Sequence, residues 1–175
     1  MNKVKTYITG QVISSNDSEA FSLYKKSFFG EIKEGKIYYS VLEAIFLLEK
    51  GKIDVYQFIN KKKKISKDEL INRARKNDNK IFQKYIVFKD LREKGYIVKT
   101  ALKFGAEFRV YDKGQKPGKE HAKWLLFTDN ESAKLSWQDF SAKNRVAHST
   151  RKNLLIAIID EEGDIIYYEV KWVRP

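Results

Sequence analysis

The first half of the chain alternates short strand-like runs with amphipathic helical segments. Residues 1–39 contain β-branched and aromatic runs separated by polar turns, such as KTYITGQVI and GKIYYS, and this pattern predicts a small antiparallel sheet. The segment SVLEAIFLLEKG, residues 40–51, opens with the capping box Ser40-x-x-Glu43 and meets Gly51 at its end, which predicts a helix. Its apolar positions are Leu42, Ile45, Phe46 and Leu48.

Two further helices are predicted on either side of a polar stretch. A second capping box, Ser66-x-x-Glu69, opens the segment DELINRARK. The stretch KNDNK, residues 76–80, is the expected boundary between two domains, 1–80 and 81–175. Beyond it, IFQKYIVFKDLREKG has an apolar face with the i, i+4, i+7 spacing of a helix. The residues on that face are Ile81, Tyr85 and Phe88.

From Tyr96 onward the hydrophobic period changes from helical to strand-like. The runs are YIVK, EFRVY, KWLLF, LLIAII and IIYYEVKWV, and the acidic turn DEEGD joins the last two. A polar stretch around residues 136–149 is expected to form a helix before LLIAII. The whole pattern predicts an α+β protein, with an N-terminal mixed α/β half and a C-terminal mixed sheet flanked by helices.

Composition narrows the partners and the chemistry. Thirty-five Lys and Arg residues against 23 Asp and Glu give a net charge of +12, which favours polyanionic partners such as nucleic acid. The chain has no cysteine and only two histidines, so a disulfide, a thiolate metal site and a zinc site are not expected, nor is any cofactor. No apolar stretch approaches the ~20 residues of a membrane span, and MNKVKTYITG lacks a signal-peptide core. We therefore expect a cytoplasmic protein.

Three residues at the ends of predicted strands are candidates for chemistry. Tyr111 ends EFRVY, where it is either a half-buried packing residue or a group at the sheet edge. His121 follows a loop rich in Gly and Lys and is either a polar surface residue or a proton-transfer group. Lys152 precedes LLIAII, where the alternatives are a solvated cation beside the core and a cation that acts on substrate.

Together, the three residue types match what RNA cleavage by its own 2'-hydroxyl requires. A base removes the 2'-proton, an acid protonates the departing 5'-oxygen, and a cation stabilises the charge on the phosphorane, all without a metal. Tyrosine is a weak base at its ordinary pKa of about 10. Neighbouring cations such as Lys103 or Arg109 would therefore have to help a catalytic tyrosine lose its proton.

Three stretches of the second half carry a resemblance to a known family. They are GYIVKTALKFGAEFRVY, the pair EH whose histidine lies ten residues after Tyr111, and RVAHSTRKNLLIAIIDEEGDIIYYEVKWVRP. They resemble the C-terminal catalytic domain of archaeal tRNA-splicing endonucleases, also called tRNA-intron endonucleases. The likeness is strongest over residues 84–175 and extends more loosely to SVLEAIFLLEKG.

The resemblance implies a role for each of the three candidates. Tyr111 would be the general base, His121 the general acid and Lys152 the group that stabilises the transition state. The implied activity is a tRNA-intron lyase, which excises introns from precursor tRNA at bulge-helix-bulge splice sites. Its metal-independent transesterification would leave 2',3'-cyclic phosphate and 5'-hydroxyl ends, on a restriction-endonuclease-like catalytic domain.

The same resemblance implies contacts with RNA and with other subunits. Arg145 would stack on a bulged base, and Arg174 matches a similar role more weakly. The turn DEEGD on its own is an ordinary hairpin tip, but in the family an acidic loop here docks into an opposing subunit. Its charged residues are Asp160, Glu161, Glu162 and Asp164. Pairing of the apolar run IIYYEVKWV between two chains would cover its edge, and a homotetramer built as a dimer of dimers is implied.

Two other functions remain open. Glu169-Val170-Lys171 fits the Glu-x-Lys pattern of metal-dependent nucleases, which use acidic residues to hold Mg²⁺. The other alternative is a non-catalytic RNA-binding subunit, whose mark would be loss of the Tyr, His or Lys, and all three are present. The run KKKK, residues 61–64, is either RNA-facing or a solvated loop.

Overall fold

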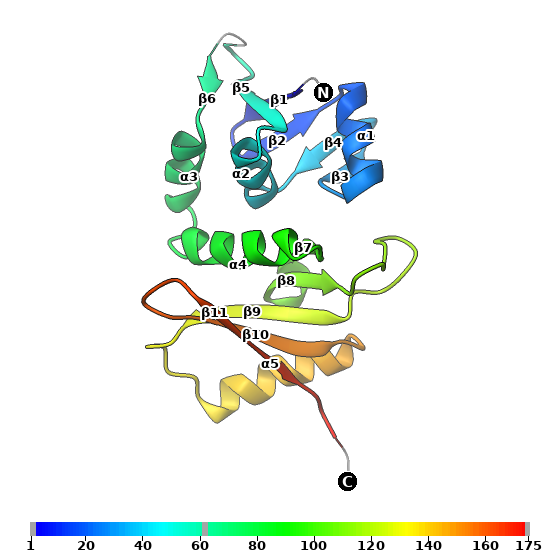
Figure 1. The fold of residues 1–175 in the computed structure, drawn as a ribbon. Helices are drawn as coiled ribbons and strands as arrows, with labels where there is room; N and C mark the ends of the chain where they lie inside the picture. Colours follow the sequence, from blue (N-terminus) through cyan, green and yellow to red (C-terminus); the bar gives the residue numbers. More distant parts are fainter. Residues whose placement is uncertain (1–2, 61–62, 174–175) are drawn as a thin grey trace. The chain divides into compact units, whose positions relative to one another are not determined.

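The chain forms two compact units, each with its own mixed sheet (Figure 1). The computed structural model describes residues 3–60 and 63–173. We call Met1–Phe82 the N unit and Gln83–Pro175 the C unit. Five α-helices and two mixed sheets in the described residues confirm the α+β class that the sequence predicted.

The N unit is built on a six-stranded sheet in the order β3-β4-β2-β1-β5-β6. Its elements are β1 (Val4–Thr9), β2 (Val12–Ser15), α1 (Ser18–Ser27), β3 (Glu31–Lys33), β4 (Lys36–Tyr39), α2 (Val41–Glu49), β5 (Ile53–Gln57), β6 (Lys64–Ile65) and α3 (Lys67–Arg75). Strands β1 and β5 pair in parallel, while the other pairs are antiparallel. The antiparallel sheet predicted for residues 1–39 is confirmed in β1 to β4. The sheet becomes mixed because β5, the strand that follows α2, returns in parallel beside β1.

Both predicted helix starts in the N unit are confirmed by their caps. The Ser40 hydroxyl accepts a hydrogen bond from the Glu43 backbone N–H, and the Glu43 carboxylate accepts one from the Ser40 N–H at 2.9 Å, which closes the capping box of α2. The Ser66 hydroxyl accepts from the Glu69 N–H at 3.1 Å at the start of α3. Most of α2 is buried, so this helix anchors the core of the N unit.

Helix α1 was not predicted from the sequence, because its residues lie within the range 1–39 that was expected to form strands and turns. Its N-cap, Asp17, turns its carboxylate to the Lys5 backbone N–H at 2.9 Å instead of to the helix. The helix ends on Phe28, a non-glycine residue at φ 55°, and it buries only Ala20 and Leu23. Because the usual cap, stop and apolar stripe are all weak, the pattern carries little helical signal.

The C unit is built on a five-stranded sheet in the order β11-β10-β9-β8-β7. Its elements are α4 (Ile81–Glu93), β7 (Ile97–Ala101), a 3₁₀ turn (Leu102–Phe104), β8 (Ala106–Tyr111), β9 (Trp124–Asn130), α5 (Trp137–Ser149), β10 (Asn153–Ile159) and β11 (Ile165–Val170). Strands β9 and β10 pair in parallel and are connected through α5, and the other strand pairs are antiparallel. The predicted helices and strands are all present, although β11 ends at Val170 and not at Val173.

Helices cover both faces of the C-unit sheet (Figure 1). On one face, the Phe88 ring of α4 lies 5.9 Å from the Phe108 ring of β8. On the other face, Ala147 of α5 joins a buried cluster with Leu125 and Leu154. Polar groups that must meet solvent are therefore confined to strand ends, loops and edges of this sheet.

Candidate active site at the end of the C-unit sheet

The strand register brings the predicted catalytic segments to one end of the C-unit sheet. Strand β8 runs antiparallel to β9, and β9 runs parallel to β10, so the end of β8 lies beside the starts of the other two. Two backbone bonds extend these ladders: Lys123 N–H donates to the Val110 carbonyl, and Asn153 N–H donates to the Lys123 carbonyl, both at 2.9 Å. Tyr111 directly follows Val110, and Lys152 directly precedes Asn153. His121 lies two residues before Lys123.

Tyr111 is buried, with 4% of its surface exposed. Arg109 lies opposite Leu125 in the register, and Leu125 packs in the cluster that contains Ala147 of α5. Because alternate residues of a strand share a face, Arg109 and Tyr111 lie on the α5 side of the sheet. Tyr111 is therefore a packed residue at a strand end, and it is more deeply buried than either interpretation made from the sequence expected.

Two acidic residues that were not among the predicted site residues, Asp112 and Glu120, make hydrogen bonds within the loop between β8 and β9. The Asp112 carboxylate accepts from the Lys123 ammonium at 2.6 Å and from the Lys113 N–H at 2.9 Å. The hydrogen bond from Lys123 is the main cause of a lowered pKa of the Asp112 carboxyl. Glu120 accepts from the Lys116 N–H at 2.6 Å, while its own N–H donates to the Lys116 carbonyl.

His121 is exposed between an ordered loop residue and a buried one. Glu120 on one side is tied back to Lys116, and Ala122 on the other is only 4% exposed. The imidazole is thus presented to solvent from a fixed backbone. The carboxylate contacts of Asp112 and Glu120 connect residues within this Gly- and Lys-rich loop to one another and to Lys123.

Lys152 is oriented by the way in which α5 ends. The Arg151 N–H donates to the His148 carbonyl and the Lys152 N–H to the Ala147 carbonyl, both at 2.9 Å, the pattern of a Schellman motif. Arg151 occupies the left-handed position, φ 57°, where glycine is usual. No sequence signal marks this turn, because the residue that adopts it is an arginine.

The Lys152 ammonium is half-buried among groups from three segments. It donates to the Thr150 carbonyl at 2.8 Å and lies 5.5 Å from the centre of the Phe104 ring. Burial lowers the pKa of Lys152, and the nearby positive charge of Arg109 lowers it further. The arrangement presents a partly desolvated cation, and a positive charge acts more strongly on an anion where solvent screening is weaker.

Of the two arginines predicted to bind RNA, one lies within the described residues. Arg145 is exposed on α5, six residues before the end of the turn that leads to Lys152. Arg174 lies outside the described residues. His148, the second histidine, packs against the Trp172 ring in a T-shaped arrangement with 4.1 Å between ring centres, so the segment after β11 contacts α5.

The acidic turn is a compact hairpin tip between β10 and β11. Asp160 is used within the turn, because its carboxylate accepts from the Asp164 N–H at 2.8 Å. Gly163, at φ 90°, allows the chain to reverse. Glu161, Glu162 and Asp164 are exposed, so three of the four predicted carboxylates face solvent.

Strand β11 forms an edge of the sheet and carries exposed apolar side chains. It pairs with β10 alone in the sheet order, and about half of the surface of both Ile166 (53%) and Tyr168 (54%) is exposed. Glu169, on the same strand, accepts from the Asn153 amide at 2.6 Å and lies 4.0 Å from the Lys171 ammonium. Glu169 of the Glu-x-Lys pair therefore already interacts with Asn153 and Lys171 at the edge of the sheet.

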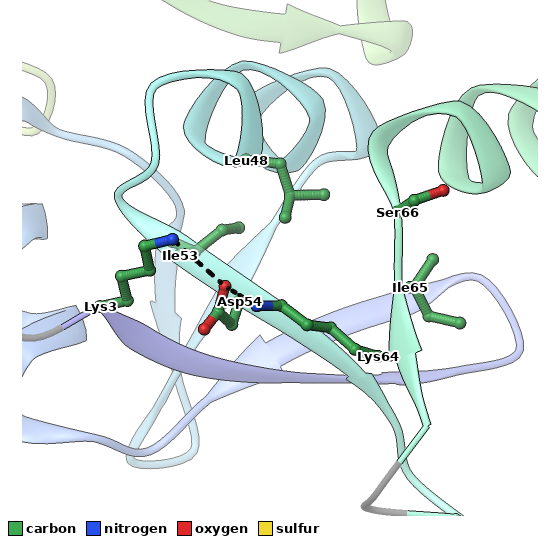
Figure 2. Close-up of a pocket in the computed structure, with 7 residues that line it drawn as sticks. All are labelled: Lys3, Leu48, Ile53, Asp54, Lys64, Ile65 and Ser66. Carbon is green, nitrogen blue, oxygen red and sulfur yellow. Dashed lines mark ion pairs between the residues drawn. The ribbon is translucent and has the colours of Figure 1, made fainter.

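Three other kinds of feature bear on function: a metal site, a membrane-spanning helix and a pocket. Within the residues that the structure describes, no three His, Asp or Glu side chains converge to hold a metal ion. Across residues 3–60 and 63–173, no helix combines the length and the apolar character needed to traverse a bilayer. A pocket of about 350 Å³ belongs to the N unit and contains none of the predicted site residues (Figure 2).

Comparisons with known proteins agree over nearly the whole chain. Residues 81–167 match the model of the tRNA intron endonuclease catalytic C-terminal domain, and residues 5–71 match that of the tRNA intron endonuclease N-terminal domain. The tRNA-splicing endonuclease of Thermococcus kodakarensis is 45% identical over 96% of this chain and 97% of its own.

More distant relatives give the same result. The tRNA-splicing endonuclease of Pyrococcus horikoshii is 42% identical over 98% of this chain and 97% of its own, and that of Methanothermobacter thermautotrophicus is 40% identical over 90% of each. With both of its halves matched in order and relatives of this identity over nearly full length, the chain belongs to the family of archaeal tRNA-splicing endonucleases.

Proposed function

We propose that the chain is an endonuclease that removes introns from precursor tRNA by a metal-independent reaction. The observation that carries the proposal is the register of β8, β9 and β10, which supports a shared location for Tyr111, the His121 loop and Lys152. Membership of the tRNA-splicing endonuclease family supports the substrate class. The cut would fall at the two bulges of a bulge-helix-bulge RNA.

The reaction is an in-line transfer of the phosphoryl group between two oxygens of the same RNA chain. Tyr111, in its ionised form, takes the proton of the 2'-hydroxyl as the 2'-oxygen bonds to phosphorus. The bond from phosphorus to the 5'-oxygen breaks, and the His121 imidazolium gives that oxygen its proton. Lys152 stabilises the added negative charge of the phosphorane. The products are a 2',3'-cyclic phosphate and a 5'-hydroxyl.

The active assembly would be a homotetramer, a dimer of dimers with two active subunits across from each other. Exposed apolar residues on the edge strand β11 support strand pairing between two copies. The exposed carboxylates Glu161, Glu162 and Asp164 support docking on a basic surface of another copy. Arg145 would stack on a bulged base, as would Arg174.

Cleavage of a bulge-helix-bulge RNA in excess EDTA, with end-group analysis of the fragments, tests the chemistry. We expect cyclic phosphate and 5'-hydroxyl ends, which His121→Ala abolishes while RNA affinity is kept. His148→Ala removes the other histidine and serves as the matched control, with cleavage expected near the parent rate. A requirement for Mg²⁺ with 5'-phosphate products would instead favour Glu169 and Lys171, and no cleavage at all would favour a non-catalytic subunit.

Sedimentation of a variant with a neutral turn tests the assembly. Glu161→Gln, Glu162→Gln and Asp164→Asn together keep the hydrogen bond of Asp160 that forms the turn. We expect the tetramer to dissociate into smaller species and cleavage to fall with it. Glu31→Gln with Glu34→Gln, which neutralises exposed acids of the N unit, is the control. A neutral turn that leaves mass and activity unchanged would refute the contact.

A further inference from the structure

The N-unit sheet has one face that its helices do not cover. Along β1, Val4, Thr6 and Ile8 are buried, while Lys5, Tyr7 and Thr9 between them are half-buried or exposed. The same alternation continues on β2, β4 and β5, so all the buried positions share one face. One row on the other face crosses all six strands in register: Glu31, Tyr38, Ser14, Tyr7, Tyr56 and Lys64.

Aromatic rings gather at the centre of this open face. The Tyr7 and Tyr56 rings lie 6.3 Å apart at 41°, and Phe58 lies edge-on to Tyr7 at 6.3 Å. Phe58 is 53% exposed, and both tyrosines are half-buried. Exposed patches of apolar surface commonly mark interaction sites, so this cluster of rings is a candidate for one.

Lysines surround the rings on the same face. Alternation and register place five lysines there against two acidic residues, which are Glu31 and Asp54. The lysines are Lys3, Lys5, Lys33, Lys36 and Lys64. The Asp54 carboxylate lies between two of them, 2.7 Å from the Lys64 ammonium and 3.9 Å from that of Lys3 (Figure 2). The negative charge of Asp54 is therefore neutralised by these two lysines, and the face keeps a net positive charge.

We propose that this open face, which we call the tyrosine face, binds a single-stranded stretch of RNA. Bases stack on Tyr7, Tyr56 and Phe58, and the surrounding lysines neutralise phosphates. Every base offers a planar ring, so such binding tolerates many sequences. The rings and lysines suit single-stranded nucleic acid in general, and the choice of RNA rests on the proposed function. The interaction adds a binding site, in the N unit, for unpaired nucleotides of the substrate.

Binding of a labelled oligouridine to the full chain, followed by fluorescence anisotropy in EDTA, tests the proposal. A length of about 12 nucleotides falls within the site sizes of single-strand binding folds. We expect Tyr7→Leu and Tyr56→Leu each to weaken binding about 10-fold, because one stacked base is lost. Tyr7→Phe keeps the ring and is expected to bind within about twofold of the parent.

Two controls separate stacking from loss of structure. Tyr24→Leu makes the same chemical change on α1, away from the tyrosine face, and is expected to leave oligonucleotide binding unchanged. Photo-crosslinking of the parent chain with an iodouridine oligonucleotide needs no variant, and adducts are expected on Tyr7, Tyr56 or Phe58. Adducts confined to the C unit, or full binding by Tyr7→Leu, would overturn the proposal.

The outcome is independent of whether the chain cuts RNA. Oligouridine binding is read without any cleavage, so failure of the tRNA-splicing assay would leave this measurement intact, and the converse also holds. If Tyr7→Leu and Tyr56→Leu change the sedimentation of the assembly but not oligonucleotide binding, the tyrosine face joins copies of the chain, and the RNA proposal is wrong.

Discussion

The two sheets of this protein use their surfaces in different ways. In the C unit, α4 and α5 cover both faces, so its candidate chemistry is confined to one end of three strands and to the edge β11. In the N unit the helices leave one face open, and that face carries aromatic rings and lysines, with the carboxylates Glu31 and Asp54 among them. The comparison suggests that a sheet covered on both sides suits catalysis, while an open face suits binding of an extended chain.

The largest effect that would test this division is loss of the Lys152 cation. Lys152→Ala should lower the cleavage rate about 10²-fold or more while RNA affinity stays near that of the parent. Single-turnover cleavage and filter binding measure the two quantities separately. Lys143→Ala removes a lysine from α5 as a control and should change neither strongly. An equal loss of affinity in Lys152→Ala would show that the C-unit site acts by binding, and the division would fail.

A second test asks whether each sheet has its own independent core. Gly30 has φ +78°, and a Cβ there would lie 2.4 Å from Ile37 Cγ2 and 2.9 Å from the Tyr38 carbonyl oxygen. Gly30→Ala should therefore lower the free energy of unfolding by about 2–4 kcal/mol. Gly10→Ala, at φ +59° with open space around it, is the matched control and should cost only about 1 kcal/mol.

The tryptophans allow the two units to be followed separately. Trp124, Trp137 and Trp172 are the chain's three tryptophans, and all belong to the C unit. In urea, Gly30→Ala should move the far-UV circular dichroism transition to lower concentration and leave the tryptophan fluorescence transition in place. If both transitions move together, the two sheets unfold as one cooperative system.

A smaller effect would test how the edge strand is held. The Tyr167 hydroxyl donates to the Asp90 carboxylate of α4 at 2.7 Å, and Asp90 also accepts from Lys94 at 2.8 Å. Burial, then this hydrogen bond, raises the pKa of Tyr167, so its phenol stays protonated. Tyr167→Phe should lower the free energy of unfolding by about 1–2 kcal/mol in urea followed by tryptophan fluorescence. Tyr168→Phe, on an exposed neighbour, should have almost no effect; equal losses would contradict the role of Asp90.

The elements of the fold were largely predictable where local signals agreed. The capping boxes at Ser40 and Ser66 and the strand runs after Tyr96 gave helices and strands in the right places. Helix α1 was not predicted because the Asp17 carboxylate accepts from the distant Lys5 N–H instead of capping the helix, and no local sequence pattern indicates this contact. The parallel pairing of β1 with β5 escaped for a similar reason, since it joins residues about 50 positions apart in the sequence.

The candidate site shows the same limit more sharply. Residue types and resemblance led to the prediction of Tyr111, His121 and Lys152 as site residues, but not of the contacts that orient their side chains. The Asp112–Lys123 pair crosses a loop, and Arg151 takes a conformation that normally marks glycine. The surroundings of Lys152 include the Phe104 ring and the charge of Arg109, which lie more than 40 residues away in the sequence. Such supporting contacts are set by the folded sheet, and composition or spacing does not reveal them.

The finest test concerns the protonation of Lys152. Because burial and Arg109 both disfavour the charged form, Lys152 should titrate below the ordinary lysine value of about 10.4. Between its folded and unfolded pKa values the unfolded chain binds more protons, so this group makes stability rise with pH in that window. Lys152 has to be charged to act on the phosphorane. Because its pKa is lowered, Lys152 loses its positive charge at a lower pH than an ordinary lysine does.

Nuclear magnetic resonance of reductively methylated lysines measures this titration directly. The Lys152 signal is the one missing from Lys152→Arg. Arg109→Gln removes the like charge but not the burial, so it should raise the Lys152 pKa only part of the way to the ordinary value. A titration at the ordinary value in the parent chain would mean that the ammonium is solvated. The C-unit site would then lack the desolvated cation that distinguishes it from the lysines of the tyrosine face.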